Sequence, residues 1–90
     1  MGFSKPSTER DCLMQIDAAL SAYVGNSNST NAKNMLAERI QVYVAFVREK
    51  GQNGHSGDLG INSSRFTKFF GITNFDSPAL RYNKITTARI

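Results

Sequence analysis

The chain has 90 residues, of which 40% are hydrophobic, 20% charged and 10% aromatic. This length is below the usual domain size of about 100–150 residues and excludes two independently folded units. The apolar content excludes a chain that is disordered throughout, because enough apolar surface is present to offset the entropy lost on folding. We therefore expect a single domain over residues 8–90, preceded by a flexible tail over residues 1–7.

Positive charge is concentrated in the second half of the chain. Of the net charge of +4, residues 51–90 contribute +3 and residues 1–50 contribute +1. A basic half of this kind can attract the phosphates of a nucleic acid. The alternative is that the net charge only keeps a small domain in solution.

Two further properties of the composition limit the location of the protein. The only cysteine is Cys12, so an intramolecular disulfide is excluded and a cysteine-based zinc site would lack ligands. The longest apolar run, over residues 42–47, is far shorter than the roughly 20 residues that cross a bilayer. We expect a cytoplasmic protein without membrane contact.

The first predicted helix begins after Thr8. This hydroxyl residue is followed three positions later by Asp11, a spacing close to that of a capping box. Apolar residues with helical spacing then form one stripe, which consists of Leu13, Ile16, Leu20, Tyr23 and Val24. Gly25 is the expected stop, and the polar residues 26–31 form the expected loop.

The second predicted helix covers about residues 30–50. Its apolar arc extends over more than half of the circumference, so the helix is either central to the core or buries a second face against a partner. The residues assigned to partner or dimer contacts are Met35, Val42, Val44 and Phe46. Residues 41–47 also suit a strand, but good helix formers lead into them without a breaker.

Four evenly spaced glycines in residues 51–60 predict a loop, because each glycine destabilises a helix. A short helix then follows a cap at Asn62 or Ser63 and ends before Gly71. The sequence Ser77-Pro78 starts a fourth helix, while residues 85–90 form a terminal strand, a frayed tail or an arm. The expected fold is mainly α, a small single-domain bundle of about four helices.

Residue patterns for catalysis are weak. Cys12 and His55 are far apart, with no local element that brings them together. Glu9 and Asp11 are interpreted as acids of the first helical turn, favoured by the helix dipole. The glycine segment lacks the lysine of a phosphate-binding loop. We expect no enzyme, no metal site and no cofactor.

The strongest pattern lies in the two short C-terminal helices. Phenylalanines occupy one side of the first of them and polar residues the other, which suits a helix that contacts phosphates and base edges. The residues predicted to bind nucleic acid are Ser64, Arg65, Thr67, Lys68, Arg81, Asn83 and Lys84.

Two helix-turn-helix frames compete in this region. The first has its turn at Leu59-Gly60-Ile61, and residues 60–69 resemble the turn and recognition helix of phage-repressor modules. The second has its turn at residues 71–74 and its reading helix over 77–84. The alternative is that the phenylalanines are core residues and the cations are their solvated neighbours.

The sequence thus favours a small non-enzymatic regulator of transcription that binds nucleic acid, expected to be double-stranded DNA, and acts as a dimer. The alternative is a protein-binding adaptor or inhibitor that uses the broad apolar face of the second helix. The first would lose affinity steeply with salt, whereas the second would be insensitive to loss of the basic residues.

Overall fold

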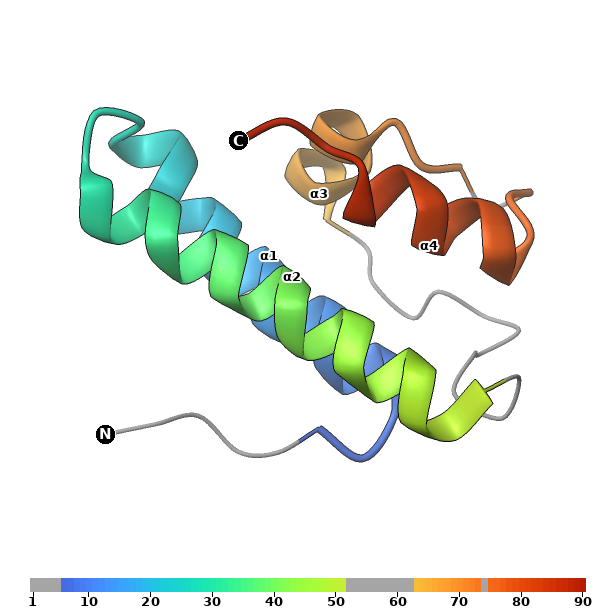
Figure 1. Cartoon of the computed structure of the whole chain (residues 1–90). Coiled ribbons are helices and arrows are strands. Elements are labelled where there is room, and N and C mark those ends of the chain that lie inside the picture. The colour runs from blue at the N-terminus through green and yellow to red at the C-terminus, as the bar shows by residue number, and fades with distance from the viewer. Residues whose placement is uncertain (1–5, 52–62, 74) are drawn as a thin grey trace.

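The computed structural model describes residues 6–51, 63–73 and 75–90. It contains four helices, α1 (Glu9–Gly25), α2 (Thr30–Lys50), α3 (Ser64–Phe70) and α4 (Pro78–Thr86). The long helices α1 and α2 form an antiparallel hairpin, and α3 and α4 lie together on one side of it (Figure 1). α3 contacts α1, and α4 contacts α2. The expectation of a small, mainly helical bundle is confirmed.

Each of the four helices begins at a hydroxyl side chain that accepts a hydrogen bond from the backbone N–H three residues later. Such a cap satisfies a donor that the first helical turn leaves without an intrahelical partner. The four capping residues are Thr8, Ser29, Ser63 and Ser77. The helix starts therefore follow directly from local sequence.

The helix ends differ slightly from the expectation. Gly25 remains inside α1, and Asn26 is the C-cap, with its N–H bonded to the carbonyl oxygens of Ala22 and Tyr23. Gly71 closes α3 as expected, with a left-handed φ of 68°, a conformation that glycine adopts without steric cost. The remaining predicted glycine loop, residues 52–60, and residues 1–5 of the predicted tail lie outside the described residues.

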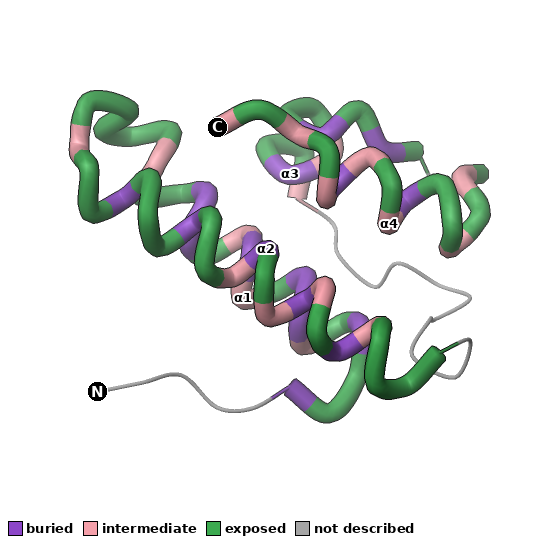
Figure 2. Tube along the Cα trace, in the orientation of Figure 1, coloured by how far each residue is buried: buried purple, intermediate pink, exposed green. Residues whose placement is uncertain are grey.

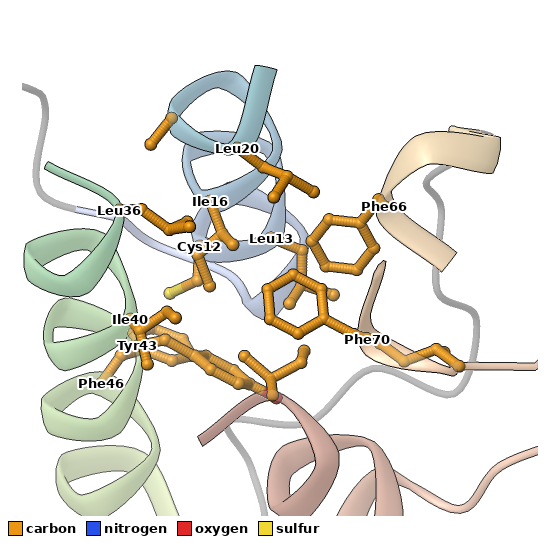
Figure 3. Close-up of a cluster of buried hydrophobic side chains, with 13 residues drawn as sticks. Cys12, Leu13, Ile16, Leu20, Leu36, Ile40, Tyr43, Phe46, Phe66 and Phe70 are labelled. Atoms are coloured by element: carbon orange, nitrogen blue, oxygen red, sulfur yellow. The ribbon is translucent and has the colours of Figure 1, made fainter. Parts of the chain in front are cut away.

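One hydrophobic core joins the hairpin to the short helices. In Figure 3 side chains of α1 lie between Leu36 and Ile40 of α2 and the rings of Phe66 and Phe70 from α3. Buried positions recur along the faces that α1 and α2 turn toward each other (Figure 2). The core residues are Cys12, Leu13, Ile16, Ala19, Leu20, Leu36, Ile40, Tyr43, Phe46, Phe66, Phe70, Ile72 and Ile85.

The C-terminal residues 85–90 complete this core. Ile85 is fully buried within α4, and Ala88 and Ile90 pack against the core after the helix ends. The described part of the chain contains no strand. Residues 85–90 are therefore neither a strand, a frayed tail nor an arm: they are the end of α4 followed by a tail that packs on the core.

The structure can be compared with only one of the two predicted helix-turn-helix frames. The turn of the first frame, residues 59–61, lies outside the described residues. In the second frame α3 and α4 are separated by residues 71–77, a longer connection than the turn of three or four residues in that module. The connection between α3 and α4 therefore does not match the second frame. None of the helices in the described ranges is long and apolar enough to span a membrane.

Candidate interaction site

Arg81 lies in the interior and not on the expected basic face. Only 3% of its surface is exposed, and its guanidinium forms two hydrogen bonds to Glu9. Nη2 lies 2.7 Å from Oε1 and Nε lies 3.1 Å from Oε2. The assignment of Arg81 to phosphate contacts is corrected on this point, because a buried cation held by a buried carboxylate does not face solvent.

Tyr43 completes the buried cluster. Its hydroxyl donates to Oε2 of Glu9 across 2.8 Å, so the Glu9–Tyr43–Arg81 cluster connects α1, α2 and α4. Burial and the bond to the Glu9 carboxylate both raise the pKa of Tyr43. Burial alone would lower the pKa of Arg81, but the hydrogen bonds and charge of Glu9 outweigh it and the pKa is raised. Glu9 is thus more than an acid of the first helical turn.

Lys84 is bound to the connection between α3 and α4. Its Nζ donates to the carbonyl oxygen of Gly71 at 2.8 Å and to Oδ2 of Asp76 at 2.9 Å. Asp76 also accepts hydrogen bonds from the N–H and hydroxyl of Thr73. The Thr73 N–H and the Lys84 ammonium hold the pKa of Asp76 below its usual value.

Arg65 connects α3 to α1. Its Nη2 lies 3.2 and 3.1 Å from the two carboxylate oxygens of Asp17, and the hydroxyl of Ser63 donates to the same carboxylate. The Arg65 side chain remains 41% exposed. It is a surface cation that already has a carboxylate partner.

The other predicted nucleic-acid contacts have no common arrangement. Lys68, Ser64 and Asn83 are exposed, and Thr67 is half-buried with its hydroxyl donating to backbone carbonyls of α3. Lys68 forms no ion pair with another described residue. The structure does not bring the four cations Arg65, Lys68, Arg81 and Lys84 together as one surface free of acidic groups.

The predicted contact face of α2 is divided. Met35 is exposed, Val42 and Val44 are half-buried, and Phe46 belongs to the core. The expectation that Phe46 is a surface contact is corrected, because only 7% of its surface is exposed and it packs in the hydrophobic core. One edge of the ring still reaches a surface pocket.

This pocket lies at the C-terminal end of α2, where the segment that precedes α1 passes beside it (Figure 1). Its volume is about 380 Å³ and its walls are mainly apolar. The lining residues are Pro6, Ser7, Val42, Ala45, Phe46, Glu49 and Lys50. The α2 residues 42, 45, 46 and 49 share one helical face, because positions three and four apart are neighbours on a helix. We call it the α2 pocket.

Two of the seven lining residues, Val42 and Phe46, were predicted from sequence to contact a partner, and the other five were not. Ala45 and Glu49 have the same helical spacing as Val42, so the α2 side could have been found from periodicity. Pro6 could not, because its contact with α2 depends on how the tail enters α1.

The candidates for catalysis and metal binding give no site in the described residues. Burial is the main cause that raises the pKa of the Cys12 thiol, to about 12, so the reactive thiolate is not populated at neutral pH. His55 lies outside the described residues. No group of three histidine, cysteine or acidic side chains suited to a metal ion occurs among the residues described.

Comparison of the chain with protein-family models, with curated proteins and with solved structures finds no match.

Proposed function

We propose that this protein is a non-enzymatic protein-interaction module whose contact site is the α2 pocket. The observation that carries the proposal is an apolar pocket of about 380 Å³ on a surface helix. Interfaces gain most of their affinity from a few aromatic or aliphatic anchors that fill such pockets. Glu49 and Lys50 add charged groups to the lining, in keeping with an apolar centre and a polar rim.

Nucleic-acid binding has weaker support. Arg65, Arg81 and Lys84 each bind a carboxylate of the protein itself. A phosphate would have to compete with Asp17, Glu9 or Asp76 for these cations, and for Arg81 the competition would expose a buried ion pair. Such competition lowers the gain from each phosphate contact, which is the main source of affinity for DNA.

The proposal is tested by titrating protein labelled with ¹³C at alanine and valine methyls with N-acetyl-phenylalaninamide. We expect the methyl signals of Ala45 and Val42 to shift, with little response to N-acetyl-alaninamide. Ala45→Asp places a charge in the pocket and removes one of the two reporters, so it should abolish the shift of the remaining one, Val42. Ala37→Asp, at an exposed position of α2 outside the pocket, is the matched control and should preserve it.

The same samples are titrated with a DNA duplex of 20 base pairs at 50 and 200 mM salt. Salt-sensitive binding that moves the methyl signal of Ala79 in α4, without any response of the pocket to the phenylalanine amide, would overturn the proposal in favour of nucleic-acid binding. No response to either probe would overturn both functions.

A further inference from the structure

Phe75 is the most exposed large apolar side chain in the described part of the chain. It is 97% exposed, whereas the next, Val24, is 54% exposed. A phenylalanine left in water forgoes the favourable free energy that burial of its ring would provide. A ring that protrudes so fully is a candidate for contact with another molecule.

The backbone that carries Phe75 is held by hydrogen bonds. The N–H of Phe75 donates to the Thr73 hydroxyl at 3.2 Å, and that hydroxyl donates to Asp76 at 3.0 Å. Lys84 joins Asp76 to the end of α3 through the Gly71 carbonyl. These hydrogen bonds restrain the backbone N–H of Phe75 and the neighbouring Asp76 side chain, and such restraint reduces the entropy that binding would cost.

We propose that the partner of the α2 pocket is a second copy of this chain, and that Phe75 of one copy enters the pocket of the other. This inference rests on the proposed function. A cavity of about 150 Å³ is large enough to hold benzene, so the α2 pocket, at about 380 Å³, has room for a phenyl ring. An apolar projection and a mainly apolar recess on one chain are complementary in polarity.

The proposed contact is small. One aromatic side chain buries about 150–250 Å², so even two reciprocal ring-in-pocket contacts fall below the roughly 1,200 Å² typical of stable complexes. Self-association is therefore weak, with a dissociation constant in the micromolar range or above. Reciprocal contacts about a two-fold axis give a closed dimer, and head-to-tail contacts give longer chains.

The experiment is sedimentation of the whole chain between 5 µM and 1 mM. We expect the wild-type mass to rise with concentration, and Phe75→Ala or Ala45→Asp to weaken association at least tenfold, the effect of losing a central anchor. Met14→Ala removes another exposed apolar side chain outside the pocket and Ala37→Asp adds the same charge elsewhere on α2. Both controls should behave as wild type.

A mixing experiment distinguishes a ring-in-pocket contact from non-specific hydrophobic association. Phe75→Ala retains the pocket and Ala45→Asp retains the ring, so an equimolar mixture should associate more strongly than either variant alone. Because the chain contains no tryptophan, Phe75→Trp provides a single reporter whose emission should shift to the blue with concentration.

A wild-type chain that stays monomeric to 1 mM, a Phe75→Ala variant that associates normally, or a mixture that fails to associate would each overturn the inference. The proposed function is judged separately, because the phenylalanine amide would still shift the pocket methyls if the natural partner were a different protein.

Discussion

The two halves of this bundle hold their helices together in different ways. The hairpin of α1 and α2 has helices of 17 and 21 residues, long enough for apolar stripes of several turns. α3 and α4 have 7 and 9 residues, and each buries only two. Short helices with few buried positions gain less from burial, and here each is also connected to the rest of the protein by an ion pair. Cations on short helices can therefore stabilise the fold instead of binding a ligand.

The largest loss of stability is expected when the buried cation Arg81 is removed. Arg81→Met leaves the Glu9 carboxylate buried without a cation, which costs about 3–5 kcal/mol in comparable pairs. We expect this loss in the free energy of unfolding, measured by urea denaturation and circular dichroism.

A double variant shows whether charge or packing is responsible. Glu9→Gln combined with Arg81→Met removes the stranded charge and retains an acceptor for the Tyr43 hydroxyl. It should recover more than half of the stability lost by Arg81→Met. Equal stability of the single and double variants would mean that the guanidinium acts through packing alone.

The local parts of this fold could be predicted from sequence, because a cap depends on residues within one turn. The buried cluster could not, since Glu9 and Arg81 are 72 residues apart. One signal was present: Glu9 has helical spacing with Leu13 and Ile16, so it lies in the apolar stripe of α1. A carboxylate at such a position predicts a buried partner without saying which. The exposed turn that presents Phe75 depends on Lys84, again through a contact between different elements.

The next effect concerns the hydroxyl that α2 contributes to the cluster. Tyr43→Phe removes its hydrogen bond to the Glu9 carboxylate while leaving the ring in place. Hydrogen bonds to charged groups contribute about 1.5–3 kcal/mol, so we expect a loss of that size in the same urea measurement. Tyr23→Phe, at a half-buried ring beside Phe69, is the control and should cost less. Comparable losses would argue against a special role for the cluster.

A smaller effect depends on pH, through the connection between α3 and α4. The pKa of Asp76 is lower in the folded protein than its usual value of 3.8, so its ionised form favours folding. This contribution is complete above about pH 5 and is lost as the pH falls through the folded pKa. Asp76→Asn should therefore reduce stability at pH 7, and the deficit relative to wild type should shrink below pH 4. Thermal unfolding at several pH values measures it, and a deficit that persists unchanged at pH 2 would contradict the assignment.

The smallest effect separates a cation that supports the fold from one that is simply solvated. Arg65 bonds to Asp17, whereas Lys68, one turn further along α3, is exposed. Arg65→Ala should cost about 0–1 kcal/mol, as partly exposed ion pairs do, and Lys68→Ala should cost less. A double-mutant cycle with Asp17→Asn measures the coupling directly. If both cations were free to bind phosphate, the cycle would give no coupling and the two alanine variants would weaken DNA binding equally. Coupling between Arg65 and Asp17, with little DNA affinity to lose, would place Arg65 with Arg81 as the cations that connect the short helices to α1.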